Sequence, residues 1–225
     1  MNRRHFFAII LALGWGLKEP SLLYAEPPPA AYFPLAVGNR WVYESSESTE
    51  VTPVVESWEV TRQEENAFVL QIKQSYMTAE GVEEFFVSTA DGIRRLDRQT
   101  VSSEAVEAEP RFFLKVPLTV GATWKNADGK YAVTAIDETV TVPAGTFTNC
   151  VEVTHWSALG TVTTITLYAP GVGMVQRDET FSVVGGGIGS FDASQFGRGI
   201  GGFDTPQQGG HAVLRLKERK ITSPF

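Results

Sequence analysis

The sequence predicts an all-β protein built on a single curved antiparallel sheet, a half-barrel or open barrel of about ten to twelve strands. Apolar and polar residues alternate with period two in nearly every segment after position 31, which is typical of strands with one face covered and the other in water. Hairpin signals such as Asp91-Gly92 and Asp128-Gly129 separate these segments. No sequence stretch beyond the N-terminal segment keeps helical periodicity for more than two turns. A sheet of this size must curl or close, which favours the barrel-like forms.

One eight-residue pattern opens each half of the ordered chain. Pro34–Trp41 and Pro117–Trp124 both read P-L-x-V-G-x-x-W, 83 positions apart. The proline cannot donate to a sheet ladder, the glycine suits a bend, and the tryptophan is a large ring to bury. We expect each copy to turn a corner into a strand.

In the first half, the strand that begins at Trp41 is followed by predicted strands at 54–62, 68–76, 85–87, 93–96 and 111–116. Phe68, Leu70, Ile72 and Tyr76 share one face of their strand, as expected for a sheet covered on one side. Residues 97–110 are polar and acidic and are predicted to form the longest loop of this half.

The second half is predicted to repeat this plan, with strands at 131–142, 151–156, 162–168, 172–177 and 212–221 after a short one at Trp124. Pro143-Ala144-Gly145 and Pro170-Gly171 fit β-turns between them. The final segment alternates apolar residues with Arg215, Lys217 and Arg219. A charged outer face of this kind predicts an edge strand.

The N-terminus is predicted to be a secretory signal peptide, residues 1–25. Arg3-Arg4 precede the apolar run Phe6–Leu17, which is too short to span a membrane, and Ala25 offers a cleavage position, with the Ala30/Ala31 bond as second choice. A retained anchor helix is the alternative. Arg3-Arg4-His5-Phe6 also resembles a twin-arginine motif, so general and twin-arginine export both stay open. No lipoprotein cysteine follows the run, and we expect a periplasmic or secreted protein without a stable membrane span after cleavage.

Three further units are expected in the mature chain. Residues 26–31 form a proline-rich spacer, because consecutive prolines favour an extended conformation. Residues 32–222 form a single β domain that contains the repeat. Residues 185–210 hold ten of the 21 glycines and are predicted to be a flexible insertion.

Charge and cysteine content exclude several classes of partner. The net charge is −7, and removal of residues 1–25 takes away Arg3, Arg4, Lys18 and Glu19, which makes it −9. An acidic chain without a Lys/Arg cluster argues against nucleic acid and against anionic membrane surfaces. Cys150 is alone, so it forms no intramolecular disulfide.

Catalytic and metal-binding patterns are weak. Cys150 and His155 are the one pair to consider as nucleophile and base, but an offset of five places them on opposite faces of a strand. His155 and His211 lack metal-ligand spacing, and the acids of the glycine-rich segment match no Ca²⁺ loop. We therefore expect neither an enzyme, a cofactor nor a metal site.

Large aromatic residues are the remaining candidates for ligand binding. In a half-barrel they either line a cavity or fill the core. The candidates are Trp41, Trp58, Trp124, Trp156, Phe68 and Tyr76.

Three motifs together resemble an uncharacterised family of exported bacterial proteins. They are Tyr32–Tyr43, with Pro34, Gly38 and Trp41; Val142–Phe147 with Cys150; and Tyr168–Gly173. That family is similar to the half-barrel group that includes periplasmic lipoprotein carriers. The resemblance covers Tyr32 to Arg177 and implies a curved antiparallel sheet with a concave apolar face. The carriers pack helices into this concavity, and the sequence here shows no helix for that place.

These observations lead to two functional expectations. The first is an exported, non-catalytic protein that binds an apolar or amphiphilic ligand, such as a lipid, on the concave face of the sheet. The alternative is a cell-envelope adaptor or assembly protein that docks on a protein partner through the glycine-rich segment or an edge strand.

Overall fold

The computed structural model describes residues 28–45, 53–75, 81–96, 111–182 and 210–222. Over these residues the protein is almost entirely β: twelve strands form one antiparallel sheet, and the single helix spans four residues. The predicted fold class is confirmed. The predicted signal peptide (1–25), nearly all of the glycine-rich segment (185–210) and the candidate Tyr76 lie outside the described residues.

The strands agree closely with the alternating segments of the sequence. Those of the first half are β1 (Arg40–Ser45), β2 (Val55–Glu64), β3 (Ala67–Gln74), β4 (Val82–Thr89), β5 (Gly92–Leu96) and β6 (Arg111–Lys115). Those of the second half are β7 (Thr123–Asn126), β8 (Gly129–Val142), β9 (Gly145–Ser157), β10 (Val162–Ala169), β11 (Gly173–Phe181) and β12 (His211–Lys220).

Each half is a meander, and the two meanders are joined by the pairing of β1 with β12. The order across the sheet is β6-β5-β4-β3-β2-β1-β12-β11-β10-β9-β8-β7. The prediction that the final strand is an edge strand is therefore wrong, because β12 lies in the middle of the sheet. Its outward-facing charged side chains lie beside those of neighbouring strands; Lys217 Nζ, for example, lies 3.2 Å from Glu44 Oε2. Because the outer face of a central strand is also exposed to solvent, alternating charges do not distinguish it from an edge strand.

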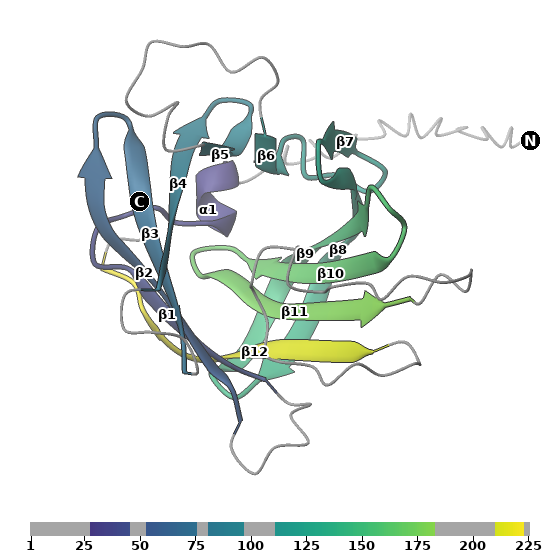
Figure 1. Cartoon of the computed structure of the whole chain (residues 1–225). Coiled ribbons are helices and arrows are strands. Elements are labelled where there is room, and N and C mark those ends of the chain that lie inside the picture. The colour runs from purple at the N-terminus through teal and green to yellow at the C-terminus, as the bar shows by residue number, and fades with distance from the viewer. Residues whose placement is uncertain (1–27, 46–52, 76–80, 97–110, 183–209, 223–225) are drawn as a thin grey trace, which may run out of the picture.

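The sheet curls until its two end strands, β6 and β7, lie next to each other, so the barrel is nearly closed (Figure 1). Side chains hold this seam. The Asn126 amide accepts a hydrogen bond from the Phe112 backbone N–H (3.0 Å) and donates one to the Phe112 carbonyl (2.9 Å). Trp124 Nε1 donates to the same carbonyl at 3.1 Å. One side-chain amide thus takes the place of a backbone partner.

The two copies of the eight-residue pattern form the same corner. Gly38 and Gly121 both have φ near +90°, a conformation that favours glycine. The Gly38 N–H donates to the carbonyl of Val60 on β2 (2.8 Å), and the Gly121 N–H donates to the carbonyl of Val133 on β8 (2.9 Å). The tryptophan that ends each copy is buried. Each corner therefore anchors the first strand of its half to the second.

A short segment before β1 fills part of the barrel interior. Pro29–Tyr32 forms the helical turn α1, which lies between the two halves of the sheet (Figure 1). Its Ala31 carbonyl accepts a hydrogen bond from the Gly171 N–H at 2.6 Å. Phe33 follows and is fully buried. Its ring contacts four others at centroid distances from 4.9 to 6.4 Å, those of Trp41, Trp58, Phe86 and Phe113.

The expected spacer at 26–31 is thus replaced over residues 29–31 by a structured turn. Proline is tolerated in the first turn of a helix, where its missing N–H has no intrahelical partner. The buried residues Ala31, Tyr32 and Phe33 then gain a place in the core. Only Pro28, with φ −60° and ψ 152°, keeps the extended conformation among the described residues of the spacer.

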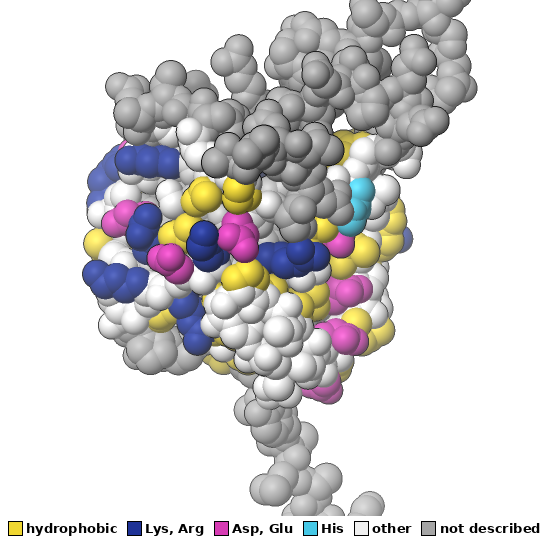
Figure 2. All heavy atoms as spheres, turned by 90° about the horizontal axis from the view of Figure 1, so that it is seen from below, with side chains coloured by type: hydrophobic (Ala, Val, Ile, Leu, Met, Phe, Trp, Pro, Cys, Tyr) yellow, Lys and Arg dark blue, Asp and Glu magenta, His cyan; other side chains and the backbone are white. Residues whose placement is uncertain are grey.

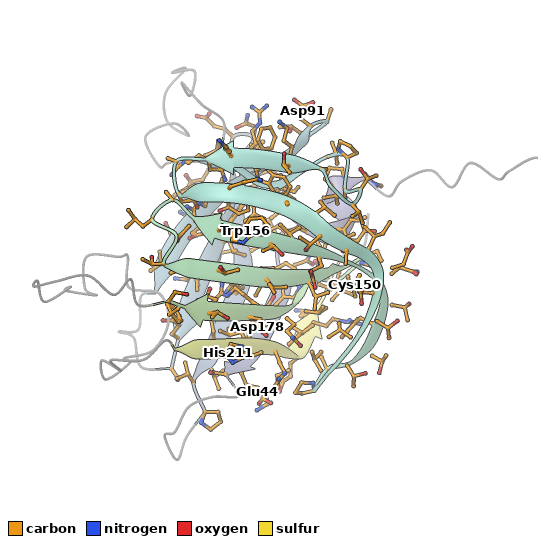
Figure 3. The ribbon with its side chains drawn as sticks, turned by 90° about the vertical axis from the view of Figure 1, so that its right-hand side faces the viewer. Glu44, Asp91, Cys150, Trp156, Asp178 and His211 are labelled. Carbon is orange, nitrogen blue, oxygen red and sulfur yellow. The ribbon has the colours of Figure 1, made fainter. Side chains whose placement is uncertain are left out.

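The long β8–β9 hairpin bends back against β12. Asp137 and Asn149 adopt left-handed backbone conformations, with φ of 58° and 56°, and interrupt the ladder between the two strands. At the tip, the Ala144 N–H donates to the Leu216 carbonyl at 3.0 Å. Cys150 is fully buried at this bend (Figure 3).

Candidate functional site

A cavity of about 200 Å³ lies inside the barrel on the side of the β6–β7 seam. Its apolar and aromatic walls are formed by Trp58, Phe112, Phe113, Val153, Tyr168 and Met174. Its polar walls are formed by Arg95, Arg111, Asn126, Asp128, Tyr131, His155, Thr164, Thr166, Arg177 and Glu179. The cavity therefore combines a buried apolar surface with an unusual density of charged and hydrogen-bonding groups.

Strand alternation explains how these side chains meet. On β10, Thr164, Thr166 and Tyr168 are spaced by two and line the cavity together, as do Arg177 and Glu179 on β11. Residues spaced by two point to the same face of a strand. The sheet curvature then brings β10 and β11 opposite β5 and β6, which are far away along the chain.

One wall carries a buried charge cluster around Arg177. Its Nε lies 3.2 Å from Glu179 Oε1, and its Nη2 lies 3.8 Å from Glu56 Oε1. Glu56 is only 3% exposed and accepts hydrogen bonds from Trp58 Nε1 (2.5 Å) and Gln74 Nε2 (2.6 Å). Buried ions persist when they are paired and hydrogen-bonded, so the charge of Arg177 is matched by carboxylates of its own wall.

This wall is poorly solvated. Burial raises the pKa of Glu179, a rise that Arg177 opposes. Burial also raises the pKa values of Tyr43 and Tyr168 well above the usual range, so both phenols stay neutral. Low solvation strengthens any electrostatic interaction that a ligand makes here.

The opposite wall is different, because it pairs two cations. Arg95 on β5 and Arg111 on β6 are direct cross-strand partners. Arg95 Nη1 lies 3.6 Å from Glu84 Oε1, and both side chains are partly exposed. The Tyr131 hydroxyl donates to Asp128 Oδ2 at 2.8 Å. Burial, and then that hydrogen bond, raise the pKa of Tyr131, while the positive charge of Arg95 opposes the rise.

A stack of three rings supports the wall at the seam. Tyr131 lies between Trp124 and His155, at centroid distances of 5.3 Å and 4.2 Å and interplanar angles of 7° and 18°. The His155 Nε2 lies 3.4 Å from the Asp128 carbonyl oxygen. These contacts fix the orientation of the polar groups at this end of the cavity.

Of the five predicted aromatic candidates that the structure describes, only Trp58 lines the cavity. Trp41 and Trp124 are buried in the core, and Phe68 packs against the core from a partly buried position. Trp156 is 38% exposed, and Lys130 Nζ lies 5.8 Å from its ring centroid. Trp156 lies on the sheet well away from the bend that holds Cys150 (Figure 3).

Cys150 and His155 occupy separate environments. The Cys150 thiol is fully buried, and burial, followed by the charge of Glu138, raises its pKa to about 11. His155 instead stacks on Tyr131 and lines the cavity. Among the described residues, no group of three or more His, Cys, Asp or Glu side chains is arranged to hold a metal ion.

Sequence reasoning missed the charged residues that give the cavity its character. One local signal was present: Glu56 occupies the strand face shared by Val54, Trp58 and Val60, and a carboxylate on an apolar face indicates a buried charge that needs a partner. That partner, Arg177, is more than a hundred positions away, and no local pattern joins the two.

Figure 2 shows acidic and basic side chains interleaved with apolar ones over the face it presents. Within the described ranges, no helix is long and apolar enough to cross a membrane.

No protein-family model matches the chain, and no curated protein matches it. Among solved structures, it is similar to a candidate lipoprotein from Parabacteroides distasonis, with 16% identity, a TM-score of 0.41, and coverage of 84% of this chain and 98% of that one. It is also similar to a candidate exported protein with a YmcC-like fold from Bacteroides fragilis, with 11% identity, a TM-score of 0.40, and coverage of 83% and 97%. Likeness at this level assigns no function to the chain.

Proposed function

We propose that this chain is an exported, non-catalytic protein that binds a small amphiphilic ligand inside its nearly closed barrel. The cavity at the seam carries this proposal, because one connected space is bordered by buried apolar side chains and by convergent polar groups. Such a combination is typical of small-molecule sites. The layout of residues 1–25, with Arg3-Arg4, the apolar run and Ala25, supports export.

The size of the cavity limits the ligand. Sites for drug-sized ligands usually measure about 300–1,000 Å³, and this one measures about 200 Å³. Much of the remaining concave face is covered by α1 and the rings around Phe33. A long acyl chain therefore does not fit as a wholly enclosed ligand, and a compact molecule, or one end of a larger molecule, fits better. Burial contributes about 0.8 kcal/mol per methylene group.

A binding role is also favoured over catalysis by what borders the cavity. Cys150 lies at the β8–β9 bend, outside the residues that line it. The ring of His155 is stacked, and the Tyr131 hydroxyl is engaged with Asp128. Docking through an edge strand has less support, because β6 and β7 face each other across a seam closed by side chains.

Native mass spectrometry tests the proposal. The protein would be released from the periplasm of an expressing bacterium without detergent and sprayed intact, then extracted with organic solvent. We expect a co-purifying small molecule. The variant Val153→Phe places extra volume in the cavity wall and should lose the adduct, while Ile165→Phe, at a more exposed site on the adjacent strand, should keep it. A clean apo mass for the wild-type protein would refute ligand carriage.

A further inference from the structure

The cavity has an uneven distribution of charge between its walls. Arg95 and Arg111 are direct partners in the β5–β6 ladder, and both line the cavity. Side chains directly opposite one another in antiparallel strands have Cβ atoms about 4.5–5.5 Å apart, and like charges at such positions repel. Two arginine side chains that start from facing positions and line one cavity can converge on a single anion.

Around the described part of the cavity, the ion pairs that involve Arg177 and Arg95 differ in burial. Arg177 is matched by Glu56 and Glu179 on its own wall. Arg95 has Glu84 at 3.6 Å, with exposed fractions of 40% and 28%, and ion pairs in such solvated positions are weak. Among the described residues, the cavity lining contains three arginines and two acids, Asp128 and Glu179.

The chemistry of the cations restricts which head groups a ligand of this cavity can carry. All cations that line the cavity are arginines. The guanidinium fork presents paired N–H donors that match carboxylate and phosphate oxygens, which a lysine ammonium does not. The same cavity is lined by Phe113, Trp58 and Val153, which suit an apolar or aromatic body.

Resting on the proposed function above, we infer that the ligand is an organic anion. Its carboxylate or phosphate head binds between Arg95 and Arg111, and its apolar body lies against Trp58 and Phe113. The paired arginines thus set the specificity of the cavity, and the burial of the apolar body adds affinity that does not depend on charge.

Matched probes test this inference. Benzoate and benzamide have nearly the same shape and differ in charge, and phenyl phosphate carries the alternative head group. Binding to the full-length mature protein would be followed by calorimetry and by NMR shifts of the tryptophan side chains. We expect benzoate or phenyl phosphate to bind at least about tenfold more tightly than benzamide, since charge-assisted hydrogen bonds are the strong ones. The tighter of the two anions identifies the head group.

Variants locate the site. Arg95→Gln and Arg111→Gln should each reduce the preference for the anion toward the level of benzamide. Arg40→Gln removes the same charge from the outer surface, where Arg40 Nε lies 4.0 Å from Glu59, and should keep the preference. Near-UV circular dichroism would verify that each variant is folded.

The outcomes separate the two proposals. If benzamide bound as tightly as both benzoate and phenyl phosphate, the anion inference would be overturned and the ligand cavity would be left standing. An anion preference that survives both Arg95→Gln and Arg111→Gln would also overturn it. If no probe binds, the inference fails, and the native mass spectrum then decides independently whether the protein carries a ligand.

Discussion

Replacement of Phe33 by alanine tests whether the segment before β1 belongs to the core. The Phe33 side chain is fully buried and contacts four aromatic rings. An aromatic side chain buries about 150–250 Å², which at about 25 cal/mol per Å² corresponds to about 4–6 kcal/mol. Alanine keeps part of that burial, and Phe→Ala changes in cores cost about 3–5 kcal/mol. We expect Phe33→Ala to lower the free energy of unfolding by about 4 kcal/mol.

Urea unfolding followed by tryptophan fluorescence measures this loss. With an m-value of about 2–3 kcal/mol per molar urea, the midpoint should fall by about 1.5–2 M. Val37→Ala is the matched control, because Val37 lies in the same segment but is 50% exposed; its effect should stay within about 0.5 kcal/mol. A loss below about 1 kcal/mol for Phe33→Ala would show that α1 and Phe33 do not hold the core together.

Three further changes test other parts of the structure. Asn126→Ala removes the two hydrogen bonds to the Phe112 backbone. We expect the free energy of unfolding to fall by about 1–3 kcal/mol and hydrogen exchange at the Phe112 amide to become faster; unchanged exchange would show that Asn126 does not hold the β6–β7 seam. Burial raises the pKa of Glu179 in the folded protein above its value in the unfolded chain, so the folded protein binds the carboxyl proton more tightly. The free energy of unfolding should therefore fall as the pH rises from the unfolded-state pKa to the folded-state pKa of Glu179. Glu179→Gln should reduce this fall of the urea midpoint with pH, measured from acidic to neutral pH. The same pH dependence in the variant and the wild-type protein would contradict the role given to Glu179. Cys150, buried and with a pKa raised to about 11, should resist alkylation at pH 8 until urea unfolds the protein; rapid labelling of the native protein, read by mass, would show that the bend is open.

The strands were predictable because each depends on a local pattern. Two-residue alternation and turns such as Asp91-Gly92 locate β-structure within a few residues. The glycines Gly38 and Gly121 marked the corners, since both adopt a backbone conformation that favours glycine. The count of strands then implied a curled sheet, because so large a flat sheet is unfavourable.

The interior was not predictable in the same way. Consecutive prolines indicated an extended spacer, but Pro29 begins a helical turn whose following residue, Phe33, fills the barrel. This placement depends on a space that only the assembled sheet creates. Likewise, Arg95 and Arg111 border the same cavity as Glu179 because the sheet closes on itself, and local sequence patterns carry no information about which distant strands face each other.

A crystal structure of the protein with its co-purified ligand, or with benzoate or phenyl phosphate at saturation, tests the central claim most directly. The account predicts density for an anionic head between the guanidinium groups of Arg95 and Arg111, with the apolar body of the ligand against Trp58. Density for a bound molecule elsewhere, or a cavity that holds only water at saturating probe concentration, would contradict it.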